Sequence, residues 1–375
     1  MRHEHNKSFK IISLFFLLIC SLLLSLLLCE LALRILVHTG QNIDLGDIVR
    51  DERSLLYRYD PLLGWFPQEN SEGNFTGCSK IYIRHNAMGF RDIDHSDKKE
   101  KKRIIFLGDS FVWGYDCPCY IITADTCLCV KKDIDPVCYN IPLKGRFVEQ
   151  LRPLLPGFEL FNMGVSGYGT DQEFLLLKKF TPIVQPDAVV LLYEEGDDTY
   201  ENVNNLVYGG YYKPYFEMEN GALVLKGVPV PRSLTYLLKA NILFRHSYLF
   251  RFLFQKYQQL NVKYEQTQPA ESPTRLIITE MYSYLKKRQI SFLIGFIEKD
   301  DAMWDFCRDL GVPCVDLIFN DRGTELRFQD HGYHWTEKGH SEAAKRILEK
   351  LYEYKMIDTS AENVGTESYF SELPR

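Results

Sequence analysis

The sequence has no excess of positive charge: 44 Lys and Arg residues stand against 50 Asp and Glu residues, and the net charge is −6 at pH 7. Proteins that bind nucleic acids through the phosphates need a basic surface, so a nucleic acid is not an expected partner. The sequence also has no internal repeat, which excludes repeat architectures. A content of 46% hydrophobic residues excludes a disordered or fibrous chain. With 375 residues, one α/β domain with additional segments fits the length.

The N-terminal segment lacks charge over a long run, from Ile11 to Cys29. Such a run can span a bilayer, and its length and all-round hydrophobicity argue against a buried core helix. It lacks the shorter apolar stretch and the A-x-A-like exit of a cleaved signal peptide, and Leu27 and Leu28 stand where a lipoprotein would have small residues. We therefore expect an uncleaved, single-pass membrane anchor in residues 1–36. Because the basic flank comes first, the rest of the chain is expected on the extracytoplasmic side.

Six of the ten cysteines form a cluster in the first half of the chain: Cys78, Cys117, Cys119, Cys127, Cys129 and Cys138. Outside the cytoplasm, an even number of clustered cysteines indicates disulfides that staple a loop, although the sequence does not fix their pairing. The two C-x-C pairs leave a metal site as the alternative, against which stands the lack of a nearby His.

Short apolar segments alternate with segments of helical periodicity in the rest of the chain. The expected strands are residues 104–107, 159–162, 188–193, 291–296 and 314–319, and the expected helices are residues 146–155, 171–184, 274–288 and 336–355. This alternation is typical of an α/β fold in which helices cover both sides of a parallel sheet. Ligands then bind beyond the carboxyl ends of the strands.

The chain divides accordingly into an anchor (1–36), a lead segment and linker (37–102), an α/β domain (103–357) and a C-terminal tail (358–375). A charged run between the lead segment and the domain is typical of a solvated linker. Two inserts interrupt the domain, a Cys-rich one at 115–142 and an aromatic-rich one at 199–272. The second insert predicts a lid or subdomain, and its aromatic residues are more typical of packing than of a ligand site.

Four short motifs lie where the expected strands end or the last helix begins. Gly108-Asp109-Ser110 follows the first strand, and a serine at this point has its hydroxyl at the sheet edge and its amide near a helix N-terminus. This position suits a nucleophile whose intermediate carries an oxyanion. Residues 162–172 leave the second strand through glycines, which let a backbone amide approach a substrate. The third block, residues 186–198, ends in acidic residues, and the fourth, residues 330–340, contains three histidines.

In this order, the four blocks resemble those of the SGNH/GDSL hydrolases (lipase- and esterase-like): G-D-S, N-x-G-x-x-G, G-x-N-D and D-x-x-H. The resemblance covers residues 103–354. Asn86 to Asp92 further resemble an N-x-x-G-[FL]-R-D motif of a membrane-anchored bacterial branch. The family implies a flavodoxin-like three-layer α/β/α sandwich that acts on esters, often acyl groups of lipids or of cell-surface carbohydrates, without a metal or another cofactor.

Carried over to this sequence, the family pattern makes Ser110 the nucleophile and His334 the general base. The amides of Ser110 and Gly167 would donate to the oxyanion. Histidine has an ordinary pKa near neutrality, as a general base needs. His340 is expected to be a packing residue at the start of the last helix. A zinc site formed by His331, His334 and His340 is the alternative, but no acidic or cysteine ligand stands at a matching spacing.

The sequence departs from the family pattern at two positions. The family has an acid three residues before the base, where this chain has His331, while Asp330 lies four before. Either a bulge brings Asp330 into place, or the site is a Ser-His dyad supported by a backbone carbonyl. Asp197 stands where the family has an oxyanion-stabilising asparagine. An ionised carboxylate would repel the oxyanion at a loss of about 10² to 10³ in rate, whereas a protonated one could donate to it.

Three functional hypotheses follow. The first is a serine esterase that hydrolyses an acyl ester of a lipid or cell-surface carbohydrate through an acyl-serine intermediate. The second is an O-acyltransferase that passes the acyl group to an envelope polysaccharide. The third is a carbohydrate-binding protein with weakened catalysis, which the departures at Asp197 and Asp330 would allow.

Overall fold

We describe the protein from a computed structural model of the chain. The structure describes residues 2–41, 43, 45, 56–76, 80–114, 122–123, 126–127, 143–207, 211–232, 242–261, 272–319, 325–327 and 333–357. The two inserts are therefore described only in part, and the C-terminal tail (358–375) lies outside the described residues.

A five-stranded sheet forms the centre of the domain, in the order β15-β14-β9-β5-β8, and every neighbouring pair is parallel. In chain order the strands are β5 (Lys102–Leu107), β8 (Phe158–Asn162), β9 (Ala188–Tyr193), β14 (Ser291–Phe296) and β15 (Cys314–Asp316). Counted along the chain as strands 1 to 5, they lie in the flavodoxin-like order 2-1-3-4-5. The predicted fold class is confirmed.

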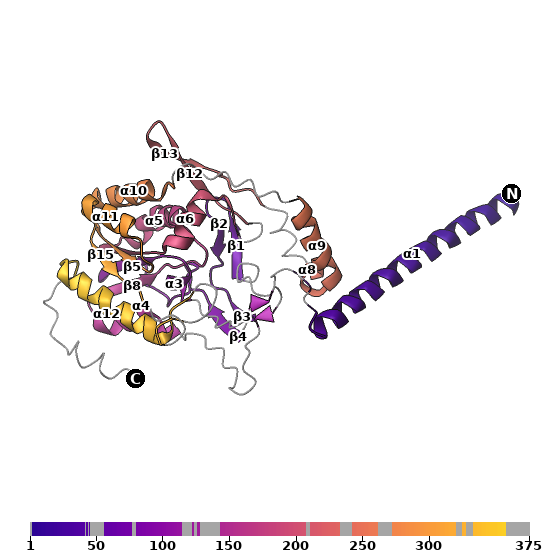
Figure 1. Cartoon of the computed structure of the whole chain (residues 1–375), viewed down its shortest axis with the longest axis horizontal. Helices are drawn as coiled ribbons and strands as arrows, with labels where there is room; N and C mark the ends of the chain where they lie inside the picture. Colours follow the sequence, from indigo (N-terminus) through magenta and orange to yellow (C-terminus); the bar gives the residue numbers. More distant parts are fainter. Residues whose placement is uncertain are drawn as a thin grey trace.

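Both faces of the sheet are buried, which explains why its strands are unbroken apolar segments. On β5, Ile105 and Leu107 point into one core, and Ile104 and Phe106 point into the other. The first core lies under α5 (Thr170–Val184), α10 (Thr274–Lys286) and α11 (Asp301–Leu310), and α6 (Glu195–Val203) contacts α5 and α10. The second core lies under α4 (Phe147–Leu151) and α12 (Glu337–Glu353). Figure 1 shows these two helical layers on either side of the sheet.

One predicted helix, residues 146–155, is shorter than expected. Regular helix ends at Leu151, and a 3-10 turn, Arg152–Leu154, follows. Pro153 lies in this turn, and proline has no backbone N–H to continue an α-helical hydrogen-bond ladder.

The lead segment packs onto the domain as two antiparallel hairpins. These are β1 (Tyr57–Asp60) with β2 (Gly64–Pro67), and β3 (Glu72–Thr76) with β4 (Lys80–Arg84). Trp65 and Phe66 are fully buried, and Phe66 stacks on Phe180 of α5 with ring centroids 5.9 Å apart. The domain core therefore includes residues upstream of the charged run.

The aromatic-rich insert contains two kinds of structure. Short hairpins come first: β10 (Leu206–Val207) with β11 (Tyr211–Tyr212), and β12 (Tyr215–Glu219) with β13 (Ala222–Lys226). Tyr211 and Phe216 belong to the domain core, as a packing role predicts. The helices α8 (Ile242–His246) and α9 (Tyr248–Asn261) follow, and α9 contacts α1 (Arg2–His38). In the Cys-rich insert, only the backbone pair β6 (Ile122–Thr123) and β7 (Thr126–Cys127) is described.

Helix α1 extends away from the domain (Figure 1). Its segment Ile12–His38 has a mean hydropathy of 2.9 and is not buried against the rest of the protein. Among the described residues, it is the one helix that is long and apolar enough to cross a membrane. A membrane anchor and a signal sequence share these properties.

Candidate active site

Ser110 lies at the carboxyl end of the central strand β5. Two residues separate it from the strand, and it opens the short helix α3 (Ser110–Trp113). The carboxylate of Asp109 caps this helix by accepting a hydrogen bond from the Phe111 amide at 2.9 Å. The Ser110 side chain is thus fixed at the sheet edge where ligands bind in parallel α/β folds.

His334 lies next to Ser110. The distance from Ser110 Oγ to His334 Nε2 is 2.8 Å, and both residues are 8% exposed. Thr336, two residues after the histidine, caps α12 by accepting a hydrogen bond from the Gly339 amide. The two predicted catalytic side chains therefore meet, although one follows the first strand of the sheet and the other precedes the last helix.

Packed aromatic rings fix the positions of Ser110 and His334 relative to each other. Phe111, adjacent to the serine, lies 4.9 Å from the His334 ring and 5.2 Å from the Trp335 ring, centroid to centroid. Trp335 is fully buried and also contacts Phe147 of α4. Because packed aromatic side chains leave little room for rotation, the Ser110 and His334 backbones cannot shift independently.

The second block wraps around α3. The Asn162 side chain donates to the Val112 carbonyl at 2.8 Å and accepts from the Gly164 amide at 3.1 Å. A Cβ atom on Gly164 would lie 2.4 Å from the Trp113 nitrogen, so only glycine fits here. Gly167 has a φ of +74° and is partly exposed. Its predicted role as an oxyanion donor remains a proposal.

The third block places two neighbouring aspartates differently. Asp197 belongs to α6, but its side chain lies outside the described residues, so its predicted place at the oxyanion is untested. Asp198 is buried and accepts hydrogen bonds from the Thr170 hydroxyl at 2.6 Å and the Glu194 amide at 3.0 Å. Burial raises the pKa of Asp198 to about 8.

An acidic cluster extends from Asp198 into the core below the site. Glu173 is 1% exposed, and among the described residues neither of its carboxyl oxygens has a hydrogen-bond partner. Burial, followed by the charges of neighbouring acids, raises its pKa well above the ordinary value. Asp171 instead pairs with Lys213 at 2.7 Å. Glu173 is therefore expected to be neutral. Burial also raises the pKa of Asp171, and the charge of Lys213 opposes that rise.

Two buried arginines fix the other end of α3. Arg91 donates to the carbonyls of Trp113 at 3.2 Å and Gly114 at 2.7 Å. Arg146 donates to the Trp113 carbonyl at 3.0 Å and to the Arg91 carbonyl at 2.7 Å. Cations are favourable at a helix C-terminus, where backbone carbonyls lack partners within the helix. Both arginines therefore fix the C-terminal end of the helix that begins with Ser110.

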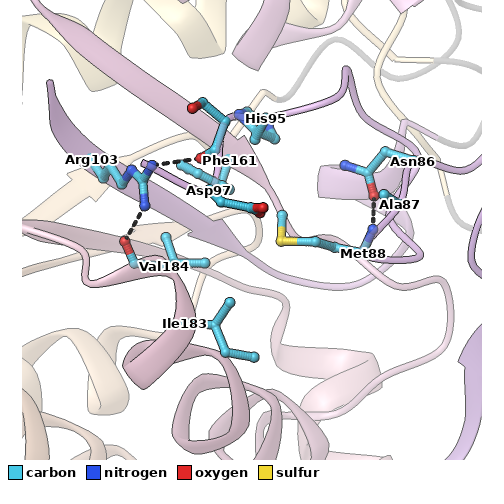
Figure 2. A pocket seen from close by; sticks show the side chains of 10 residues that line it. Asn86, Ala87, Met88, His95, Asp97, Arg103, Phe161, Ile183 and Val184 are labelled. Atoms are coloured by element: carbon cyan, nitrogen blue, oxygen red, sulfur yellow. Dashed lines mark hydrogen bonds between the residues drawn. The ribbon is translucent and has the colours of Figure 1, made fainter. Parts of the chain in front are cut away.

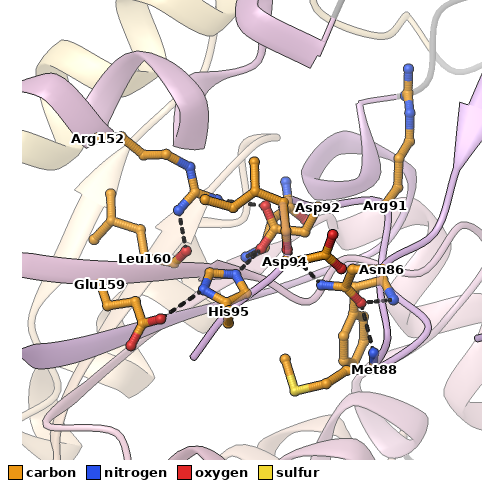
Figure 3. A network of polar contacts seen from close by, with 12 residues as sticks. Asn86, Met88, Arg91, Asp92, Asp94, His95, Arg152, Glu159 and Leu160 are labelled. Atoms are coloured by element: carbon orange, nitrogen blue, oxygen red, sulfur yellow. Dashed lines mark hydrogen bonds and ion pairs between the residues drawn. The ribbon is translucent and has the colours of Figure 1, made fainter. Parts of the chain in front are cut away.

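Asp92 connects the lead segment to the second block (Figure 3). Its Oδ2 accepts from the Asn162 amide at 2.9 Å and lies 2.7 Å from His95 Nε2, and its Oδ1 pairs with Arg152. The other His95 nitrogen lies 3.1 Å from Glu159. Burial raises the pKa of Asp92, but the hydrogen bond with His95 and the charge of Arg152 outweigh it and hold the pKa below its usual range.

The remaining predicted site residues are described only in part. Asp330 and His331 lie outside the described residues, and so do the side chains of the six clustered cysteines. Whether Asp330 completes a triad, and whether disulfides staple the insert, therefore stay predictions. His340 is buried against Phe147, with the rings stacked at 6.0 Å, as a packing residue would be. Within the described part of the chain, no group of three His, Cys, Asp or Glu side chains could hold a metal.

A cavity of about 300 Å³ lies near the amino end of β5, whereas Ser110 lies beyond its carboxyl end. Figure 2 shows the residues that line this cavity. Arg103, near the start of β5, and Val184, at the end of α5, are among its lining residues, and Arg103 donates to the Val184 carbonyl at 3.0 Å. Because Ser110 lies beyond the other end of β5, this cavity does not belong to the Ser110–His334 site.

No protein-family model matches the chain, and no curated protein does. The chain is similar to solved structures of GDSL hydrolases. One is a GDSL-like lipase from Bacteroides thetaiotaomicron, 11% identical over 69% of this chain and 93% of that one, with a TM-score of 0.33. Another is the psychrotrophic esterase EstA from a Pseudoalteromonas species, 9% identical over 68% and 99%, with a TM-score of 0.37. A third is a lipase/acylhydrolase from Enterococcus faecalis, 12% identical over 68% and 96%, with a TM-score of 0.34.

Likenesses at these TM-scores decide neither the family nor the membrane-anchored branch, so the resemblance of the four blocks stays a prediction. Identities this low leave the chemistry to be argued from Ser110 and His334 themselves.

Proposed function

We propose that the protein is a membrane-anchored serine esterase that hydrolyses an acyl ester of a lipid or cell-surface carbohydrate. The observation that carries this proposal is the 2.8 Å contact between Ser110 Oγ and His334 Nε2 at the carboxyl edge of the sheet. A serine hydroxyl is a weak nucleophile until a base within hydrogen-bond reach accepts its proton. The contact supplies such a base.

The reaction would proceed in two steps through an acyl-serine. Ser110 Oγ attacks the ester carbonyl while His334 Nε2 accepts the hydroxyl proton, and the tetrahedral intermediate collapses as His334 protonates the departing alcohol. A water molecule, deprotonated by the same nitrogen, then attacks the acyl-serine. The carboxylic acid departs, and Ser110 regains its proton from His334.

The intermediate needs donors for its oxyanion, and we assign the backbone amides of Ser110 and Gly167 to this role. Ser110 opens α3, so its amide is not used by the helix ladder. The left-handed backbone of Gly167 lies in the block that wraps around the same helix. We further assign Asp330 to orient His334, through a one-residue bulge that brings it to the position of the family's acid, and Asp197 to the oxyanion side.

We place this site on the extracytoplasmic side of a membrane. Helix α1 has the length and hydropathy of a single span. The basic residues of the chain's first ten positions precede the apolar run, which favours retention of that end in the cytoplasm.

The test is labelling of the detergent-solubilised full chain with a fluorophosphonate probe, which reacts with activated serines. Wild-type protein should be labelled and should hydrolyse a short-chain nitrophenyl ester, and Ser110→Ala should lose both properties. Ser341→Ala is the matched control, because the Ser341 hydroxyl bonds to a carbonyl of its own helix, α12, and should be without effect.

The serine and the histidine should also act as a unit. His334→Ala alone should reduce kcat by at least about 10³, and the double variant should be little worse than either single variant. Additive losses, or labelling that survives Ser110→Ala in a folded protein, would assign the nucleophile elsewhere.

A further inference from the structure

The helices α8 and α9 expose large apolar side chains on their outer side. Ile242 is 70% exposed, Leu243 56%, Leu253 54% and Tyr257 52%. Apolar side chains of this size are not needed at the surface for the helices to fold. An exposed apolar group that recurs along one helical segment marks a contact surface.

The same two helices have a separate interior. Phe244 of α8 packs edge to face on Phe250 and Phe254 of α9, with ring centroids 6.0 and 5.1 Å apart. Phe244 and Phe254 are buried. Because these three rings already fill the inside of the pair, the outward-facing Leu253 and Ile242 are left for an external partner.

The end of α1 holds this pair of helices. The Glu30 carboxylate accepts hydrogen bonds from the Ser247 hydroxyl at 2.9 Å, the Tyr248 amide at 3.0 Å and the Leu249 amide at 2.8 Å. A carboxylate in this position caps the N-terminus of α9 and complements the helix dipole. Arg34 donates to Glu30 at 2.7 Å and lies over the Tyr248 ring. Figure 1 shows α1 and α9 diverging from this contact.

This contact sets the level of α9 relative to a membrane. Glu30 is the first charged residue after the uncharged run from Ile11 to Cys29. If that run crosses the hydrocarbon core, Glu30 lies where the core ends and the headgroups begin. The N-terminus of α9 is bonded to it and therefore starts at the bilayer surface.

The charge of this part of the chain is opposite to that of the whole. Residues 242–261, which form α8 and α9, contain no Asp or Glu and three basic residues, Arg245, Arg251 and Lys256, whereas the complete chain has a net charge of −6. Basic residues next to exposed apolar side chains are typical of helices that lie in the headgroup region of anionic membranes.

We propose that α8 and α9 form an interfacial surface that docks onto anionic phospholipids of the bilayer that α1 spans. The proposal rests on the membrane anchor of the proposed function and goes beyond it, because it gives the chain a second attachment to the same membrane. Leu253 and Tyr257 insert between the lipid chains, and Lys256 lies at the phosphate level. Two attachments restrict the rotation of the catalytic domain about the anchor.

The test compares two tryptophan variants of the full chain in vesicles of phosphatidylcholine and phosphatidylglycerol whose acyl chains carry bromine, a contact quencher of tryptophan. Leu253→Trp places the probe on the proposed surface. Met218→Trp is the matched control, because Met218 is also 54% exposed but lies in the hairpin β12–β13. The brominated lipids should quench the tryptophan fluorescence that Leu253→Trp adds, and they should not quench the fluorescence that Met218→Trp adds. In the Leu253→Trp background, Lys256→Gln should weaken docking to anionic vesicles about fivefold.

Flotation with the vesicles separates the two proposals. Protein that floats but shows no quenching at position 253 overturns the docking surface and leaves the anchor intact. Protein that does not float overturns both. The Leu253→Trp fluorescence could instead stay unquenched and shift to the blue as the protein-to-lipid ratio rises. That result would show that the surface binds a second copy of the chain, and it would overturn lipid docking.

Discussion

Phe111 and Trp335 pack edge to face with ring centroids 5.2 Å apart, and each directly follows one member of the Ser110–His334 pair. The contact joins the helix that begins with Ser110 to the segment that carries His334. A serine hydroxyl and an imidazole must stay within hydrogen-bond reach for proton transfer. The two aromatic rings provide this constraint from the core.

We expect Trp335→Phe to lower kcat by about 10- to 100-fold, because a shift of about 1 Å in a catalytic group can have an effect of that size. KM should change little, since Trp335 is fully buried and does not face the substrate. The free energy of unfolding should fall by about 1–3 kcal/mol. The measurement is steady-state ester hydrolysis together with thermal unfolding.

Trp304→Phe is the control for that variant. Trp304 lies on α11 and packs on Phe296, with ring centroids 5.0 Å apart, in the other core. It should lose stability without losing kcat. A Trp335→Phe enzyme with the kcat of the wild type would show that the ring pair does not position His334.

The sequence-based prediction succeeded where local pattern decides the structure. Buried parallel strands are short apolar runs, so each strand of the sheet could be located, although β15 ends at Asp316, earlier than expected. That Ser110 and His334 meet could be predicted because their motifs lie at the ends of such elements, and their catalytic roles stay predictions. The helix 146–155 was predicted too long because the apolar spacing continues through Pro153, which a regular helix does not accommodate.

The supporting residues of the site could not be predicted in the same way. Arg146 is 0% exposed, and nothing in its neighbourhood in the sequence distinguishes it from a surface arginine. Its role depends on the Trp113 carbonyl, which tertiary folding brings to it. For Asp92 a motif gave a signal but no role, because its partners Asn162 and Arg152 lie in later elements.

We expect Asp197→Asn to raise the rate of ester hydrolysis, by up to about 10² to 10³, if the aspartate faces the oxyanion and is ionised. The substitution replaces a repelling acceptor with a donor of nearly the same shape. If Asp197 is instead held protonated, the wild type should be most active at low pH, and the variant should lose that dependence. An unchanged rate and an unchanged pH profile would remove Asp197 from the site.

The neighbouring residue provides the control for this variant. Asp198 accepts hydrogen bonds from Thr170 and from the Glu194 amide, whereas an asparagine keeps only one acceptor oxygen and must turn its NH2 group toward one of these two donors. Asp198→Asn should therefore lower the free energy of unfolding by about 1–3 kcal/mol and should not raise the rate. A rate increase in Asp198→Asn but not in Asp197→Asn would mean that the third block aligns one residue later.

Glu173→Gln should flatten the dependence of stability on pH. In the folded protein, burial and then the neighbouring acids raise the pKa of Glu173 well above its ordinary value of 4.5. The folded state therefore holds a proton that the unfolded chain releases above about pH 4.5, and each pH unit above that value lowers the wild-type stability by up to about 1.4 kcal/mol. Glutamine has nearly the same shape and does not titrate.

Thermal unfolding of the solubilised full chain at several pH values between 5 and 8 should show a smaller loss of stability in Glu173→Gln than in the wild type. The loss that Asp198 contributes, with its pKa of about 8, should be common to both proteins. Equal slopes would mean that Glu173 is ionised in the folded protein, in which case a cation must lie close to its carboxylate.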